Sequence, residues 1–293
     1  MTVNAVVGYD GSPESSAAIS VGASLFVKSH AWITYLWAPP YASEKVRRRL
    51  RPLARDIHEL TEMVEREGEL EAQRLVAMGV TLARAAGWDA EPHLKRTWGA
   101  QGLRFAQVAD EVQADLVLVG SRGLGGTQAT LGSVSDMVVH YCARPVVVIP
   151  HPMLAAEYEA LREGPVLLGW DGSAGAERAF TVAARLFPDR NMLLVAVDDK
   201  CDAAALPADP APPGGREILR LDVGRGHGLH GRAISDALAA TANDRNAALV
   251  VVGSRGRSPA REVLLGSVAM GTLHHSHRPV MVVPREWEAP NAR

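Results

Sequence analysis

A glycine-rich turn in the carboxyl-terminal half of the chain has the residue types and spacing to hold an anion. Gly253-Ser254-Arg255-Gly256 follows the apolar run ALVVV, and nine residues separate Gly256 from Gly266-Ser267. Glycines let the backbone approach a bulky anion without Cβ clashes. A helix that begins at Gly266-Ser267 would offer a phosphate its free N–H groups and its positive dipole end, and Arg255 and Arg257 could add charge-assisted contacts. The spacing alone leaves open a second interpretation, a strand-to-helix turn that needs glycine only for its geometry.

The amino-terminal half carries a related turn that is one residue shorter. Gly120 and Gly123 bound the same GSRG sequence, and eight residues separate Gly123 from Gly132-Ser133. One residue fewer before a helix would rotate the later side chains by about 100°. The second half is therefore predicted to contain the better site.

An aspartate follows the first apolar run of each half. Asp10 lies in GYDGS and Asp171 in GWDGS. Ligands of open parallel sheets bind beyond the carboxyl ends of the strands, which is where these aspartates and the glycine turns would meet. The alternative is that each aspartate only forms a turn or caps a helix. Neither turn is a P-loop or a dinucleotide fingerprint, because G-x4-G-K-[ST] and G-x-G-x-x-G are both missing.

Four sequence blocks recur in the same order, so the chain reads as a tandem duplication. VVGYDGS (6–12) recurs as LLGWDGS (167–173), ADLVLVGSRG as AALVVVGSRG, LGSVSDMV as LGSVAMGT, and RPVVVIP (144–150) as RPVMVVP (278–284). We expect one domain over 1–150, a connector over 151–164, and a second domain over 165–293.

Each half alternates strand and helix, which predicts a doubly wound α/β unit with a five-stranded parallel sheet. Ser12 is expected to cap the first helix, with Pro13 at its first position. The apolar spacing from Glu44 to Ala86 predicts a long helix, with a break near Gly68 or Gly79. The second half is shorter at this place and carries a run rich in Pro and Gly, so we expect no long helix there. One sheet face of the second half would then be bare or covered by a neighbour.

Composition indicates a globular protein and excludes several functional classes. The 293 residues are 47% hydrophobic, and 31 Lys and Arg against 33 Asp and Glu give a net charge of -2. A nucleic-acid or anionic-membrane binder would show a strong basic excess. Two cysteines suit a reducing compartment, and no signal peptide or membrane-spanning run is evident, so a cytoplasmic location is expected.

The motifs together resemble the universal stress protein family. The resemblance rests on V-x-Y/W-D-G-S, on V-V-G-S-R-G followed by L-G-S-V, and on a closing R-P-V-x-V-x-P, and it covers nearly the whole chain twice. It implies a five-stranded parallel α/β sandwich, with ATP, with or without Mg²⁺, bound by members that keep G-x2-G-x9-G-S/T. The positions it implies for the adenine are Asp10, Asp171 and the backbone near Leu36 and Ala196. Those it implies for the ribose and phosphates are Gly253, Gly256, Gly266 and Ser267, with Gly120, Gly123, Gly132 and Ser133 in the first half.

The resemblance also implies how the halves associate and what they do. The fifth strands, Pro145–Ile149 and Pro279–Val283, would pair within the chain as a pseudo-dimer, and two chains could form a homodimer. We expect a nucleotide-binding regulatory or stress-response protein. The alternatives are a weak ATPase or nucleotide-dependent transferase, and an interaction scaffold without nucleotide. Catalysis ranks lower because no acidic residue stands out beside the glycine turn to orient water or Mg²⁺.

Other motifs are weaker. The run VRRRLR (46–51) is expected to be a solvated helix face, with protein or RNA contact as the minority interpretation. His274, His275 and His277 fit a solvated helix end better than a metal site, because no carboxylate or Cys lies nearby. Cys142 sits in an apolar helix and is expected to be buried rather than reactive.

Overall fold

The computed structural model describes residues 2–99, 101–121, 131–199, 218–223, 230–256 and 265–287, in which strands and helices alternate. The strands are β1 (Val3–Gly8), β2 (Ser29–Trp37), β3 (Asp89–Arg96), β4 (Leu116–Gly120), β5 (Val146–Ile149), β6 (Val166–Gly169), β7 (Met192–Asp199), β8 (Ile218–Val223), β9 (Leu249–Gly253) and β10 (Val280–Val283). The helices are α1 (Pro13–Leu25), α2 (Glu44–Leu50), the short 3-10 helix η1 (Arg51–Leu53), α3 (Ile57–Ala85), α4 (Gln101–Glu111), α5 (Ser133–Tyr141), α6 (Ala155–Glu163), α7 (Ala174–Leu186), α8 (His230–Asp244) and α9 (Ser267–His275).

The strands form one ten-stranded sheet in the order β3-β2-β1-β4-β5-β10-β9-β6-β7-β8. Within each half all neighbouring strands are parallel, as predicted for a doubly wound α/β unit. The halves join through β5 and β10, which pair antiparallel with Met281 opposite Val147. This antiparallel junction reverses the strand direction, so the carboxyl ends of the two sets of strands lie at opposite edges of the sheet. A site built at those ends in one half is therefore remote from its counterpart in the other.

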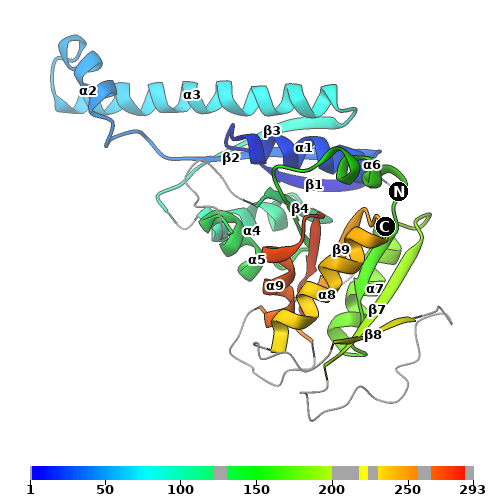
Figure 1. Cartoon of the computed structure of the whole chain (residues 1–293). Coiled ribbons are helices and arrows are strands. Elements are labelled where there is room, and N and C mark those ends of the chain that lie inside the picture. The colour runs from blue at the N-terminus through cyan, green and yellow to red at the C-terminus, as the bar shows by residue number, and fades with distance from the viewer. Residues whose placement is uncertain are drawn as a thin grey trace.

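Two helical layers cover the sheet (Figure 1). The side chains of α1, α3, α6 and α7 pack on one face, against residues such as Leu118 and Leu168. The side chains of α4, α5, α8 and α9 pack on the other, against Val117 and Val250. Because β4 and β9 are buried on both faces, they read in the sequence as unbroken apolar runs. In the part of the chain that the structure describes, no helix combines the length and the apolar character needed to cross a bilayer.

The long helical segment of the first half is broken at a different place from the one predicted. Chain direction changes at η1, which contains Pro52, and α3 then runs without interruption through Gly68 and Gly79. A Cβ at Gly68 would lie 2.6 Å from Pro40 Cδ, and one at Gly79 would lie 2.7 Å from Ile33 Cγ2. These glycines therefore allow α3 to pack closely on β2 and its following loop. Their cost in helix propensity, about 1 kcal/mol each, is offset by that packing.

The second half differs from the first beside β7 and β8. Residues 200–217, where the sequence predicts that the long helix is missing, lie outside the described residues. On the face that α3 covers in the first half, Leu194 and Ala196 of β7 are buried, whereas Arg220 and Asp222 of β8 are exposed and charged. Of the two alternatives expected for this face, bare or covered, β7 is therefore covered. Charged side chains on the edge strand β8 instead oppose strand-to-strand association.

The connector between the halves contains an ordered helix that the sequence did not indicate. Leu161 of α6 is 1% exposed and packs in the core that α1 and α7 share. Arg190 donates to the carbonyl oxygens of Leu161 and Gly164 at 2.6 and 3.1 Å, which satisfies the end of α6. Between the halves, the Phe26 and Phe187 rings lie 5.2 Å apart at equivalent helix ends. The connector and these rings fix the two halves against each other.

Candidate functional site

In both halves the DGS sequence forms the same tight turn from strand to helix. Asp171 Oδ1 accepts the Ser173 backbone N–H at 3.0 Å, and Ser173 Oγ accepts the Ala176 N–H at 3.2 Å as the N-cap of α7. Asp10, Ser12 and Ser15 repeat these contacts at α1, which confirms the predicted Ser12 cap. The glycine between Asp and Ser has a φ of 79° in the first half and 71° in the second. Positive φ favours glycine, and one carboxylate oxygen of each aspartate serves the turn.

The second carboxylate oxygen of Asp171 faces the glycine turn after β9. A Cβ placed on Gly256 would lie 2.5 Å from Asp171 Oδ2, closer than real Cβ contacts occur. Gly256 thus lets the turn approach the carboxylate, although the two residues are far apart in the chain. The structure brings together two residues that the sequence analysis assigned separately to the ligand site.

The first glycine of the turn has a packing role. A Cβ on Gly253 would lie 2.8 Å from the Gly175 carbonyl oxygen, and a Cβ on Gly175 would lie 2.0 Å from the Arg255 carbonyl oxygen. The turn therefore packs backbone to backbone across the first turn of α7. Gly120 has the same role in the first half, because its Cβ would lie 2.7 Å from the Glu14 carbonyl oxygen. Close backbone packing alone therefore explains why glycine is present at Gly253 and Gly120.

The helix that follows the turn begins without a side-chain cap. Gly266 is the N-cap of α9 and its own N–H donates to the Ser254 carbonyl at 2.7 Å, which closes the loop. Ser267 is the first helical residue, and its Oγ would lie 2.4 Å from a Cβ on Gly231. The N-termini of α1, α2, α3 and α7 are capped by Ser or Asp side chains, whereas α5 and α9 start at glycine and have none. Uncapped N–H groups at a helix start suit an anion.

The shorter spacing in the first half does not rotate its helix. Gly132 N–H donates to the Ser121 carbonyl at 2.8 Å, matching the contact between Gly266 and Ser254. Both N-cap glycines are extended, with φ of -61° at Gly132 and -73° at Gly266. The start of α5 therefore matches the start of α9 despite the shorter spacing, and the predicted rotation at Ser133 is wrong. Gly123 and Arg257 lie outside the described residues.

Two of the positions implied for the adenine, Leu36 and Ala196, are not equivalent in the structure. The pairing of β1 with β2 places Gly8 opposite Thr34, and that of β6 with β7 places Gly169 opposite Val195. Ala196 is therefore the counterpart of Tyr35 and not of Leu36. Both side chains are buried, at 5% exposure for Leu36 and 1% for Ala196, so only their backbone could meet a ligand.

The structure adds residues beside Asp10 that the sequence analysis missed. A Cβ on Gly11 would lie 2.7 Å from Leu75 Cδ1, which places α3 over the first-half turn. Burial, together with the charges of Asp10 and Glu71, raises the pKa of the Tyr35 phenol. Because α3 is remote in sequence from the DGS turn, no local signal could have shown this. The two halves therefore present different surroundings to their equivalent aspartates.

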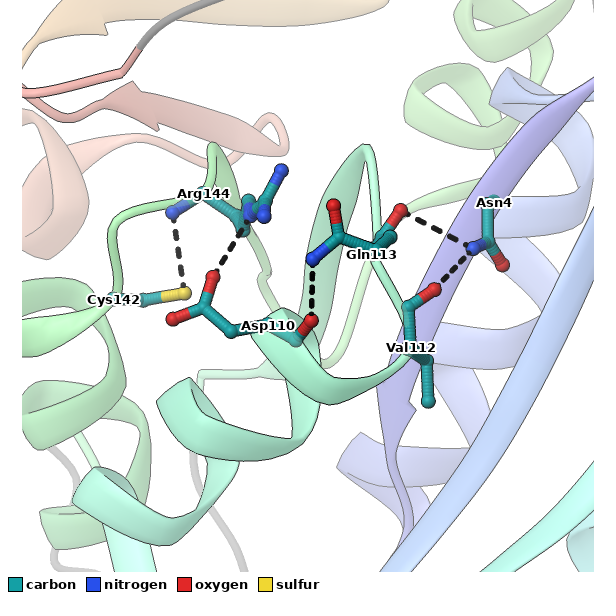
Figure 2. A network of polar contacts seen from close by, with 6 residues as sticks. All are labelled: Asn4, Asp110, Val112, Gln113, Cys142 and Arg144. Carbon is teal, nitrogen blue, oxygen red and sulfur yellow. Dashed lines mark hydrogen bonds and ion pairs between the residues drawn. The ribbon is translucent and has the colours of Figure 1, made fainter. Parts of the chain in front are cut away.

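The two remaining candidates for chemistry behave as ordinary structural groups. Cys142 is 4% exposed, and burial raises the pKa of its thiol to about 11. Figure 2 shows its Sγ accepting the Arg144 N–H at 3.4 Å, while Arg144 Nε contacts Asp110 Oδ1 at 3.1 Å. The buried thiol agrees with the predicted core role. His274 and His277 are exposed, and no three potential metal-ligating side chains cluster among the residues that the structure describes.

The fold defines a class of α/β protein built from two doubly wound units, each with a DGS turn and a glycine turn at the carboxyl ends of its parallel strands. The model of the universal stress protein family matches residues 1–150 and 164–284. A universal stress protein of Mycolicibacterium smegmatis is 31% identical over 95% of this chain and 96% of its own, and one of Mycobacterium tuberculosis is 30% identical over 94% and 95%. The crystal structure of a universal stress protein from Archaeoglobus fulgidus has the same fold, with a TM-score of 0.60 and 18% identity over 97% of this chain and 96% of its own. The chain belongs to the universal stress protein family, with two tandem family domains.

Proposed function

We propose that this protein binds ATP as a nucleotide-dependent regulatory protein of the cytoplasmic stress response. We also propose that the second half is the principal site, because Leu75 of α3 lies over the corresponding DGS turn of the first half. The observation that carries the proposal is the contact between Gly256 and Asp171, which places the end of the glycine turn beside a carboxylate with one oxygen directed at it. The uncapped start of α9 supplies N–H groups at the other end of the turn. These features fit the resemblance of G-x2-G-x9-G-S to the nucleotide-binding members of the family.

In this proposal each part of the site has a separate task. Asp171 accepts a hydrogen bond from the adenine, with the Ala196 backbone beside the base. The Gly253–Gly256 turn and the start of α9 at Gly266 and Ser267 hold the ribose and phosphates, and Mg²⁺ would arrive with the ATP. Glycine at position 256 is needed because any side chain there occupies the space beside the carboxylate.

We further propose that nucleotide binding regulates the protein by changing the relative stability of two of its states. Such coupling is typically worth about 1–3 kcal/mol, and it requires the ligand to bind the two states with different affinity. The β5–β10 pairing joins the two halves as two subunits are joined in a dimer. A conformational change on nucleotide binding in one half can therefore reach the other half through these strands. No group beside the glycine turn is assigned a catalytic role.

The test is an equilibrium titration of the full chain with ATP by calorimetry. We expect one site per chain, lost in Gly256→Val and retained in Gly123→Val, the matched change in the first half. Phosphate release measured at stoichiometric protein separates binding from hydrolysis. Absence of binding heat and of dialysis uptake at saturating ATP would refute the proposal. Equal loss in both variants would refute the assignment to the second half.

A further inference from the structure

The helical arm formed by residues 44–71 has an uneven distribution of charge. We call residues 44–55 the tip and residues 56–71 the shaft; the tip comprises α2, η1 and the turn after them, and the shaft is mainly the start of α3. All of the cationic side chains of the tip are exposed, namely Lys45, Arg47, Arg48, Arg49, Arg51 and Arg55. The shaft is acidic, with carboxylates at Asp56, Glu59, Glu62, Glu65, Glu67, Glu69 and Glu71 against one arginine, Arg66.

The arm is held in a defined position by contacts at its base. Arg96 of β3 makes a two-pronged contact with Glu65, with Nη1 at 2.9 Å and Nη2 at 2.8 Å from the two carboxylate oxygens. Gly68 packs against Pro40, and a small apolar cluster around Leu50 and Val64 holds α2 against α3. Figure 1 shows α2 at the end of α3 that extends away from the second half. An arm so fixed loses little conformational freedom when it meets a partner.

Several charges of the arm have no partner within the part of the chain that the structure describes. Arg48 pairs with Glu44 and Arg55 with Glu59. The charged side chains without an ion pair or hydrogen bond there are the tip cations Lys45, Arg47, Arg49 and Arg51, the shaft carboxylates Glu67 and Glu69, and the single shaft cation Arg66. Two apolar side chains between these groups are also exposed, Leu53 by 66% and Ile57 by 72%. The surface therefore combines unneutralised charge of both signs with exposed apolar area.

Apart from Arg55 and Glu59, the tip and shaft charges do not pair with each other within one arm as the structure describes it. The tip packs beside Leu60 and Val64. Glu69 lies five residues beyond Val64, which corresponds to about 8 Å along α3 at about 1.5 Å per residue. This is about the Debye length at physiological salt, so the attraction between these exposed charges is already weakened. The unpaired groups are therefore available to an opposite charge on another molecule.

We infer that the arm is a self-complementary docking surface whose partner is a second copy of this chain. Two arms placed antiparallel, and offset along their axes, bring each basic tip onto the acidic shaft of the other. The same two contacts form twice about a two-fold axis, as in the common closed dimers. Leu53 and Ile57 lie between the charged regions and become covered. A polyanion such as RNA fits less well, because the adjacent acidic shaft and the net charge of -2 oppose it.

Sedimentation velocity of the full chain tests this interface. We expect a salt-sensitive dimer, with a larger dimer fraction at about 0.05 M than at about 0.5 M salt. The tip variant carries Arg47→Glu, Arg49→Glu and Arg51→Glu. The shaft variant carries Glu62→Lys, Glu67→Lys, Glu69→Lys and Glu71→Lys, which makes the shaft net positive. Each variant alone is expected to sediment as a monomer, because its tip and shaft then have the same sign of charge.

The decisive measurement is the equimolar mixture of the two variants. One variant then has a negative tip and shaft, and the other a positive tip and shaft, so both contacts of a mixed dimer are attractive. We expect the mixture to recover the dimer. The matched control has three exposed arginines outside the arm reversed, Arg162→Glu, Arg245→Glu and Arg285→Glu, and it should dimerise like the original protein.

Several outcomes would overturn the inference. A monomer at every salt concentration would do so, as would a dimer unchanged in both variants or a mixture that fails to associate. A monomeric chain that binds a single-stranded RNA through the tip would assign the tip to that partner instead. Thermal melting of each variant distinguishes loss of the interface from loss of the fold. The result is independent of the ATP titration, because none of these residues lies at the Asp171 site.

Discussion

The contact between Gly256 and Asp171 makes Gly256→Ala a sharp test of the candidate site. The added Cβ would lie 2.5 Å from Asp171 Oδ2, whereas real Cβ contacts are almost never closer than 3.0 Å. Either the carboxylate or the turn must therefore move by about half an ångström. Gly256 has no positive φ, so the substitution introduces this contact without backbone strain. The perturbation is confined to one carboxylate.

The expected effects on stability and on ligand affinity differ in size. The contact falls on Asp171 Oδ2, so the hydrogen bond that Oδ1 accepts from the Ser173 N–H is weakened rather than lost. Folding stability should therefore fall by only a part of the roughly 1.5–3 kcal/mol that a bond to a charged acceptor is worth. If the carboxylate also accepts a hydrogen bond from adenine, the loss for a charged acceptor is about 1.5–3 kcal/mol. That corresponds to a dissociation constant raised about ten- to a hundred-fold. The binding defect should therefore exceed the stability defect.

A double-mutant cycle measured by calorimetry separates a direct effect from one transmitted through the carboxylate. Gly256→Ala, Asp171→Ala and the double variant are each titrated with ATP. If Gly256→Ala acts by displacing Asp171, it adds little to the loss already caused by Asp171→Ala. Fully additive losses, or a Gly256→Ala protein with unchanged affinity, would refute this reasoning. Gly123→Ala in the first half is the matched control and should leave the second-half titration unchanged.

Three further predictions concern packing and reactivity. Arg278 is 4% exposed, its Nη1 has no partner in the described structure, and its Nε contacts Asn243 Oδ1 at 3.3 Å. Asn243→Asp should therefore raise the unfolding free energy at pH 7 by about 1 kcal/mol in urea titrations. The raised pKa of Cys142, about 11, leaves about one thiol in a thousand ionised at about pH 8, so peptide mass spectrometry should find this site alkylated only after denaturation. Phe187→Ala removes a buried ring packed against Phe26, and this should cost about 3–5 kcal/mol of stability.

Each of these predictions has a control or an outcome that would contradict it. The first half provides the reference for Asn243→Asp, because Arg144 there pairs with Asp110 at 3.1 Å. An unchanged or lowered urea midpoint of unfolding would show that a carboxylate beside Arg278 does not stabilise the fold. Rapid alkylation of Cys142 in the native protein would mean that the helix end opens readily. The control for Phe187→Ala is Val27→Ala, at a side chain that is 70% exposed. This control should change stability by less than about 0.5 kcal/mol, and a similar loss in both variants would place the Phe187 effect outside the core.

Local sequence signals predicted well those elements whose causes are local. Ser12 caps α1 because a short side chain next to Pro13 bonds the first free N–H groups, whatever the rest of the chain does. The break before α3 was predicted at glycine but lies at Pro52, whose ring and missing N–H oppose a regular helix more strongly. Gly68 and Gly79 were predicted as helix breaks because glycine has a low helix propensity. Their close packing against Pro40 and Ile33, which keeps them within α3, depends on the tertiary structure and leaves no signal in the local sequence.

The sequence by itself determined the duplication, the parallel strands of each half and the residue types of the ligand turn. These follow from repeated motifs and from apolar runs, which depend on neighbours in the chain. Only the tertiary structure decided which residues meet. Parallel pairing of β6 with β9 carries Asp171 to Gly256 from a distant part of the chain, and antiparallel pairing of β5 with β10 sends the two sites to opposite edges of the sheet. The physical reason is that a strand can pair with several strands distant in the sequence. Which of them it pairs with depends on how the sheet buries its apolar faces and not on any local preference.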